Sequence, residues 1–113
     1  MNHQRLKCYV LLLDVARMVP TLVKRLPRGN YFLEDQLKRA LGSAMLNLAE
    51  GNARRSQKER NRFFDISLAS IAETASALDI IQVFGFITHE YAEDIKSNLR
   101  SSYAMLRKLK KRI

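Results

Sequence analysis

The sequence contains few residues that interrupt helices. Its 113 residues include only two prolines and four glycines. That scarcity argues against a turn-rich β protein and leaves room for long helices. Apart from Pro20 and Gly42, the interruptions fall at residues 26–30, at Gly51 and at Gly85, and apolar residues recur at helical spacing between them. Because short connections favour antiparallel neighbours, we expect one all-α domain over residues 1–113, an antiparallel up-and-down four-helix bundle.

Local signals predict the limits of the first two helices. The first is expected over about residues 4–25, with Pro20 kinking it or weakening its last turn. The second is expected to begin at residue 31, with Asn30 as a candidate N-cap. Gly51 is a candidate left-handed C-cap, so this helix is expected to end there.

The last two helices begin with capping signals. Residues 56–59 form a capping box, in which the Ser56 hydroxyl and the Glu59 side chain can bond to exposed amide groups. The third helix is expected to continue to residue 84 and to stop at Gly85. Thr88 is expected to cap the fourth helix.

The third helix has an unusually wide apolar surface. Two neighbouring stripes cover an arc of about 200°, against the roughly 100° that a surface helix needs. The first stripe consists of Phe64, Leu68, Ile71, Ala75 and Leu78, and the second of Phe63, Ile66, Ser70, Ala77 and Phe84. This width indicates self-association through a second apolar surface, and a monomer with a thick core is the alternative.

Positive charge is the second constraint. The net charge is +9, from 20 Lys and Arg against 11 Asp and Glu, which favours polyanion partners: nucleic acid first, an anionic membrane surface second. A merely soluble basic protein remains the alternative. In an up-and-down bundle, the chain start, the turn after the second helix and the chain end meet at one end. The candidate nucleic-acid-binding residues there are Arg54, Arg55, Lys58, Arg60, Arg62, Arg107, Lys108, Lys110, Lys111 and Arg112, with Arg5 and Lys7 nearby.

The basic residues of the turn are more informative than those of the tail. Cations near a helix C-terminus also complement the helix dipole, which explains the tail. The cluster from Arg54 to Arg62 lies at a helix start, where the dipole disfavours cations. Because Phe63, Phe64 and Tyr103 are expected to pack inside, we predict phosphate contacts with little base readout.

A polar stripe is predicted between the second and third helices. It consists of Gln36, Arg39, Ser43, Asn47, Glu50, Glu59, Ser70 and Glu73. We expect an ion pair between Arg39 and Glu73, and a hydrogen bond between Asn47 and Glu59. A role in helix register or at a subunit interface is favoured over an active site.

The sequence offers little for catalysis or for a cofactor. No serine has a recognisable base, and neither His3 nor His89 has metal-ligand spacing to another donor. Cys8 is the only cysteine and is expected to be a small buried hydrophobe. The longest apolar stretch, residues 8–13, is too short for a membrane span. We therefore expect a cytoplasmic protein that is not an enzyme and needs no metal, cofactor or membrane.

A set of these residues resembles a known family. The set comprises Gln36, Arg39, Ala40, Ser43, Asn47, Ala49, Glu50, Gly51, Arg55, Ser56, Glu59, Phe63, Ile66, Ser70 and Glu73. It resembles the four-helix-bundle proteins encoded in intervening sequences of bacterial 23S ribosomal RNA genes. It is also similar to the accessory variability determinant proteins of diversity-generating retroelements. The resemblance spans about residues 26–109, and Ser67 and Ala69 depart from the usual alanine and glycine.

The resemblance implies a homopentameric barrel with a basic surface. For the retroelement branch it implies binding to a reverse transcriptase and to nucleic acid, RNA or DNA. Our first hypothesis is therefore an oligomeric nucleic-acid-binding accessory protein. The alternative is an intervening-sequence-encoded scaffold for protein partners with no direct nucleic-acid role, and a helix-turn-helix DNA reader ranks third because the flanking helices are too long.

Overall fold

The computed structural model describes residues 3–110, which fold into four α-helices. They are α1 (His3–Val23), α2 (Tyr31–Ala53), α3 (Gln57–Val83) and α4 (His89–Leu109). The described residues contain no strand, so the prediction of an all-α chain with four helices is confirmed. The molecule measures 45 × 23 × 20 Å, and its long dimension is close to the roughly 40 Å length of a 27-residue helix such as α3.

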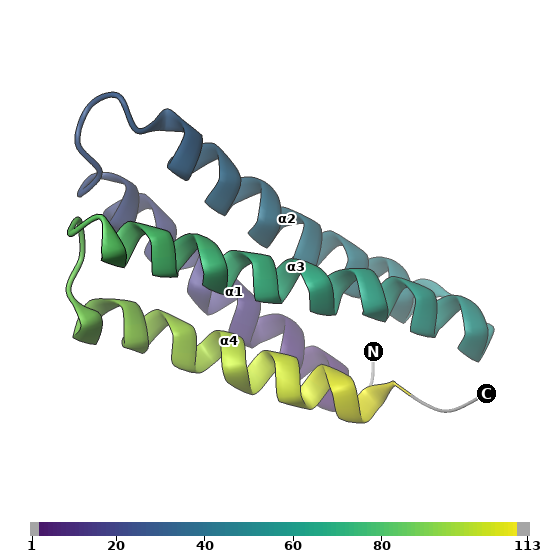
Figure 1. Cartoon of the computed structure of the whole chain (residues 1–113). Helices are drawn as coiled ribbons and strands as arrows, with labels where there is room; N and C mark the ends of the chain where they lie inside the picture. The colour runs from purple at the N-terminus through teal and green to yellow at the C-terminus, as the bar shows by residue number, and fades with distance from the viewer. Residues whose placement is uncertain (1–2, 111–113) are drawn as a thin grey trace.

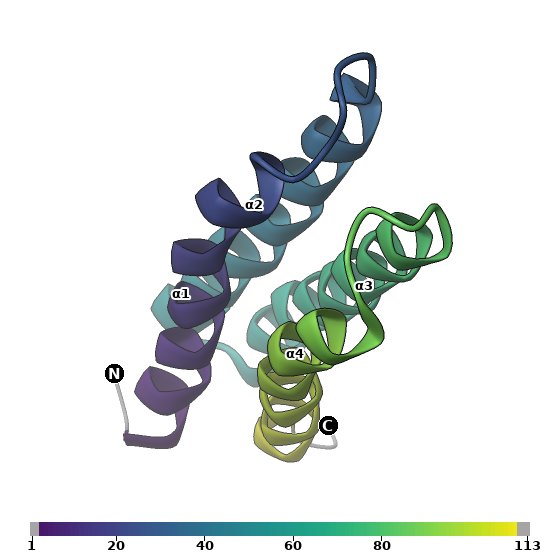
Figure 2. The ribbon, with the colours of Figure 1, turned by 90° about the vertical axis from the view of Figure 1, so that its left-hand side faces the viewer.

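The helices surround one core in chain order. Packing is most extensive between α2 and α3, followed by α1 with α4. Within residues 3–110, the diagonal pairs α1/α3 and α2/α4 make no close backbone contact. Each helix therefore touches the helices before and after it in the ring, and α4 closes the ring against α1 (Figures 1 and 2).

Hydrogen bonds show how α2 and α3 run past one another. Gln36 near the start of α2 bonds to Glu73, whereas Ala44 further along α2 bonds to Ser67 earlier in α3. The two helices therefore run in opposite directions. Figure 1 shows the α2–α3 turn, the start of α1 and the end of α4 at one end of the molecule, opposite the other two loops.

The core takes apolar side chains from all four helices. Phe64 is the largest fully buried side chain, and Leu12, Leu37, Leu78 and Leu99 are equally inaccessible. Full burial of such a side chain contributes about 1.5–3 kcal/mol. The apolar periodicity of the four segments is therefore the main stabilising feature of the fold.

The N-caps predicted for Ser56 and Thr88 are confirmed, whereas the Glu59 carboxylate of the predicted capping box pairs with Arg62 and makes no bond to the Ser56 amide within residues 3–110. The Ser56 hydroxyl accepts a hydrogen bond from the Glu59 amide, and the Thr88 hydroxyl accepts one from the Tyr91 amide, each at 3.1 Å. Gly85 has a φ of +84° and follows the last turn of α3, as predicted. A glycine suits this position because L-residues with side chains avoid positive φ.

The capping roles predicted for Gly51 and Asn30 are wrong. Gly51 lies buried inside α2, which continues to Ala53. A Cβ atom on Gly51 would lie 2.6 Å from two ring carbons of Phe64, so this glycine serves close helix packing and not a left-handed turn. The Asn30 side chain does not cap α2, because its amide donates instead to the Pro27 carbonyl at 2.8 Å within the preceding loop.

The first helix is shorter than predicted. It continues through Pro20 and ends at Val23, two residues before the expected limit. Its buried face consists of Cys8, Leu12, Val15, Val19 and Leu22, while Leu6 and Val10 on the neighbouring face are exposed.

Cys8 is fully buried, as predicted, and it contacts a buried serine of α4. The Cys8 Sγ lies 3.2 Å from the Ser102 Oγ, and the thiol donates to the Ser102 carbonyl at 3.5 Å. The Ser102 hydroxyl also donates to the Cys8 carbonyl at 3.4 Å. This exchange of hydrogen bonds explains why the apolar pattern of the fourth helix lapses at Ser102.

Cys8 is expected to be unreactive in the folded protein. Burial raises the pKa of the Cys8 thiol, and the hydrogen bond from Ser102 opposes this effect only in part. The thiolate is the reactive form, so below the raised pKa the buried thiol reacts slowly. Iodoacetamide labelling at pH 8, followed by mass spectrometry, should be at least about tenfold slower in the folded protein than in the denatured chain. Equal rates would contradict the buried environment.

Among the described residues, α3 alone is long and apolar enough to meet the length and hydropathy criteria for a membrane span. Its mean hydropathy reaches 1.3 over the best window, and 44% of that window is buried inside the bundle. A core helix of a bundle meets the same criteria, so this feature agrees with the central packing of α3.

Candidate nucleic-acid interface

Basic residues gather at the end of the molecule that holds the α2–α3 turn. The candidate binding residues that the structure describes come from the turn, the start of α3 and the end of α4: Arg54, Arg55, Lys58, Arg60, Arg62, Arg107, Lys108 and Lys110. Lys110 bonds to Asp65 at 2.6 Å, which joins the end of α4 to the start of α3. The other two candidates, Lys111 and Arg112, lie outside the described residues.

Some of these cations are already paired with carboxylates. The pairs are Arg54 with Glu50 at 2.7 Å, Arg62 with Glu59 at 3.8 Å, and Lys110 with Asp65. All three pairs are largely exposed, so they stabilise the fold little. Their effect is to reduce the net positive charge that these three side chains present to a ligand.

Arg60 has a structural position in the turn. Its guanidinium donates to the Arg54 carbonyl at 2.8 Å and to the Gln57 side chain at 3.4 Å. The Arg54 carbonyl follows the last residue of α2, so this bond ties the end of α2 to the start of α3. Arg5 of α1 lies close to Arg60: its pKa is lowered, first by burial and second by repulsion from the Arg60 charge.

The remaining cations are exposed and make no ion pair or hydrogen bond within residues 3–110. They are Arg55 and Lys58 at the turn, Arg107 and Lys108 at the end of α4, and Lys7 near the start of α1. At the end of the molecule that holds the α2–α3 turn, these are the charges available to an external anion. Arg55 and Lys58 flank the Ser56 N-cap, where the positive end of the α3 dipole adds to their field.

Phe63 is not inside the core as predicted. It is half-buried, with the guanidinium of Arg54 at 4.9 Å and that of Arg62 at 5.1 Å from its ring centroid. These cation–π contacts hold both arginines over the ring. Because guanidinium groups already occupy the ring, the arrangement favours phosphate contacts over base stacking.

The predicted polar stripe does form between α2 and α3, in part. The Gln36 amide donates to Glu73 at 2.6 Å, and the hydroxyls of Ser43 and Ser70 lie 2.8 Å apart. Asn47 donates to the Ser43 carbonyl at 2.8 Å. These bonds cross or border the α2–α3 contact, which agrees with a role in helix register.

The two contacts predicted within this stripe are wrong. Arg39 is exposed and pairs with Asp35 of its own helix at 3.7 Å, because Gln36 occupies the position that reaches Glu73. Glu59 faces Arg62 one turn further along α3, and Asn47 bonds back within α2. Glu50 likewise bonds to Arg54. Glu50 and Glu59 thus belong to the basic end and not to the stripe.

Sequence reasoning missed a bond made by Ser67. Its fully buried hydroxyl donates to the Ala44 carbonyl of α2 at 2.7 Å. Ser67 was noted only as a departure from the usual alanine. The bond could have been predicted from the position of Ser67 beside apolar residues of the third helix, because a buried hydroxyl needs a hydrogen-bond partner.

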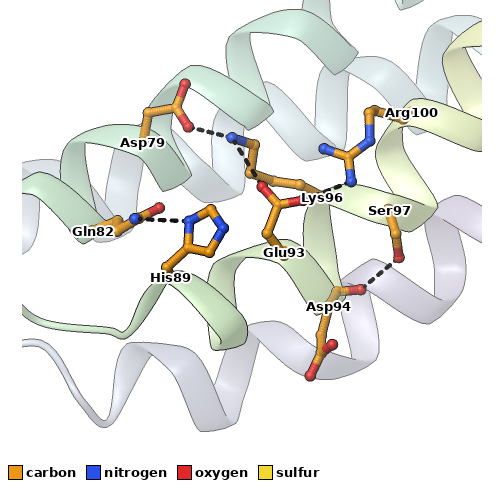
Figure 3. Close-up of polar contacts among 8 residues, drawn as sticks. All are labelled: Asp79, Gln82, His89, Glu93, Asp94, Lys96, Ser97 and Arg100. Carbon is orange, nitrogen blue, oxygen red and sulfur yellow. Dashed lines mark hydrogen bonds and ion pairs between the residues drawn. The ribbon is translucent and has the colours of Figure 1, made fainter.

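Towards the other end of the molecule, several cations are paired with neighbouring carboxylates, whereas Lys24 and Arg28 are exposed and make no ion pair within residues 3–110. Figure 3 shows Lys96 of α4 between Asp79 and Glu93, and Arg100 donating to Glu93 at 2.7 Å. The hydrogen bond from Arg100 is the main cause of the lowered pKa of Glu93. His89 is exposed beside Gln82. Among the described residues, no three His, Cys, Asp or Glu side chains are grouped to hold a metal ion.

A second surface feature is an exposed apolar face on α2 and α3. Leu46 is 71% exposed, Ile66 39% and Ile80 43%, and Val83 and Phe84 at the end of α3 are also exposed. The second apolar stripe predicted for the third helix therefore divides. Ser70 and Ala77 are buried against the bundle, whereas Ile66 and Phe84 face solvent.

The fold and the surface define a small basic helical-bundle protein with a group of unpaired cations at the end that holds the α2–α3 turn. The sequence matches the 23S rRNA-intervening sequence protein family over residues 4–108, and the chain belongs to that family. Its fold is similar to a crystal structure from Bacteroides thetaiotaomicron, a protein of unknown function from the S23 ribosomal protein family. The TM-score is 0.84 at 20% identity, over 94% of this chain and 96% of that one. No curated protein matches the sequence.

Proposed function

We propose that this protein is a non-enzymatic, basic, oligomeric accessory protein that binds nucleic acid mainly through phosphate contacts. The observation that carries the proposal is the pair of exposed, unpaired cations at the α2–α3 turn, Arg55 and Lys58. They lie at a helix start, where the dipole disfavours cations, so helix stability does not explain them.

The chemistry of phosphate binding fits this end of the molecule. Cations that neutralise phosphates release condensed counterions, which gives salt-sensitive and largely sequence-independent affinity. Arg107 and Lys108 extend the unpaired charge to the end of α4. Base readout needs donors and acceptors aimed at base edges, and the exposed side chains of the turn are mainly cations.

We further propose that antiparallel bundles of this kind assemble into a homopentameric barrel through the exposed apolar face of α2 and α3. Leu46, Ile66 and Ile80 support this, because large apolar side chains exposed on two neighbouring helices can be buried by a second copy. Assembly would present several basic ends together. Weak phosphate contacts then add up through multivalency.

The accessory role would place a reverse transcriptase of a diversity-generating retroelement among the partners, in the cytoplasm and away from membranes. Similarity to the accessory variability determinant proteins is the only support for that partner. A protein-interaction scaffold without nucleic-acid contact is the alternative. It predicts a protein complex that survives nuclease treatment.

The double variant R55A/K58A is expected to bind nucleic acid more weakly and with less salt dependence. Losing two phosphate contacts lowers the slope of log affinity against log salt by about 1.8 for a duplex and about 1.4 for a single strand. At about 0.7 kcal/mol for each contact, affinity falls about tenfold. Fluorescence anisotropy with a structured RNA and a DNA duplex, between 50 and 300 mM salt, measures both quantities.

Two matched variants sharpen this test. Lys24→Ala/Arg28→Ala removes the same charge from exposed positions at the opposite end and should change the slope little. Glu50→Gln removes the carboxylate that holds Arg54 and should increase affinity. Equal slopes for R55A/K58A and K24A/R28A would overturn the assigned site. No binding by the unmodified protein near 150 mM salt would favour the scaffold.

A further inference from the structure

A groove at the basic end separates the start of α1 from the end of α4. It is lined by His3, Gln4 and Lys7 from α1, and by Ser101, Met105 and Lys108 from α4. Lys7 and Lys108 are exposed and make no ion pair within residues 3–110, and no Asp or Glu lines the groove. The groove therefore combines two available positive charges with the apolar side chain of Met105 and with several uncharged polar side chains.

Two other grooves that border α4 lack this combination. The groove between α3 and α4 contains Lys96 and Arg100, but both are paired with Glu93. A groove further along α1 and α4 contains Arg17 together with Asp94. Arg17 is itself paired with an aspartate one turn away. In both cases a carboxylate already occupies the position that a phosphate would take.

The helix dipole explains the position of Lys108 but not that of Lys7. Lys108 lies in the last turn of α4, where a cation complements the dipole. Lys7 lies in the second turn of α1, near the end where the dipole disfavours cations, and the first turn of α1 holds no acidic residue. Lys7 therefore faces Lys108 across a groove without a compensating anion, which indicates an external one.

We propose that this groove binds a single strand of nucleic acid, with its phosphates against Lys7 and Lys108. This inference rests on the proposed function and adds that the bound nucleic acid is single-stranded. Single-strand binding combines a positively charged groove that follows the backbone with side chains that contact exposed bases, whereas the bases of a duplex are stacked and paired inside it. Met105 offers an apolar surface to a sugar or base, and Gln4, His3 and Ser101 offer hydrogen bonds to its polar edges.

The position of the groove in the ring keeps it open in an assembly. The α1–α4 pair lies opposite the α2–α3 pair, whose exposed apolar face we propose as the contact between copies. Figure 2 shows the start of α1 and the end of α4 at the lower end of the view. A strand could therefore occupy the groove of each copy without competing with assembly.

The test compares single-stranded and duplex probes of the same sequence. Fluorescence anisotropy across a salt series is measured with a labelled 12-nucleotide single strand, as RNA and as DNA, and with the matching duplexes. The protein is the full chain, as the unmodified protein and as K7A/K108A, K24A/R28A and R55A/K58A. Each of these three variants removes two exposed positive charges, so the variants differ in where the charge is lost and not in how much is lost.

K7A/K108A is expected to lower the single-strand salt slope by about 1.4, and the duplex slope by no more than the roughly 0.9 that Lys108 alone accounts for. Circular dichroism should show unchanged helicity, because both lysines are exposed. If the single-strand salt slope of K7A/K108A equals that of K24A/R28A, the proposal that the groove binds a single strand is contradicted. If R55A/K58A still weakens binding in that case, the proposed function is supported and only the proposal for the groove is contradicted. If the unmodified protein binds no probe, the proposed function fails first.

Discussion

Replacing Gly51 with alanine is expected to lower the free energy of unfolding by about 1–2 kcal/mol. The new Cβ would lie 2.6 Å from Cδ1 and Cε1 of the fully buried Phe64 ring and 3.2 Å from the Arg60 carbonyl oxygen. Overpacking of this kind costs about 1–3 kcal/mol, and the gain in helix propensity offsets about 0.5–1 kcal/mol of it. Urea unfolding followed by circular dichroism measures the change.

Gly42 provides a matched control in the same helix. Nothing lies within 4 Å of a Cβ at this position, so Gly42→Ala should raise the free energy of unfolding by up to about 1 kcal/mol. The double variant G51A/F64L should lose less than the sum of its single changes, because leucine vacates space beside Ala at 51. Equal stabilities for G51A and G42A would show that Gly51 is not a close-packing position.

Replacing Leu46 with glutamate is expected to dissociate the proposed assembly without unfolding the subunit. Leu46 is 71% exposed on α2, so a carboxylate there is solvated in an isolated subunit. At a contact between copies, the same carboxylate would be buried without a partner, which is strongly unfavourable. Light scattering after size-exclusion chromatography should show the mass fall from that of an oligomer to about 13 kDa, with unchanged helicity.

Leu6→Glu is the matched control for this change. Leu6 is 49% exposed but lies on α1, away from the α2–α3 face, so its replacement should leave the mass unchanged. Dissociation by both variants, or by neither, would place the contact between copies elsewhere on the surface. A monomeric unmodified protein would remove the multivalent part of the proposed function, while single-site phosphate binding could still be measured.

Local patterns in the sequence determined the helices themselves. Apolar residues at helical spacing give each segment one face that must be buried, so four helices and one core follow without knowledge of the neighbours. The Ser56 and Thr88 caps and the Gly85 stop were also predictable, because each acts within about four residues of chain. The gathering of basic residues followed from the order and length of the helices.

The tertiary structure alone decided which side chains meet across helices. Gly51 and Asn30 both carry the local signature of a cap, yet close packing on Phe64 and a loop carbonyl determined their roles. Arg39 and Glu73 have opposite charges on adjoining helices, but the rotation of α2 places Gln36 at that contact. Helical periodicity determines on which side of its own helix a residue lies. Which side chain of another helix it contacts depends on how each helix is rotated about its axis and how far apart the helices are, and only the packing of the core determines these.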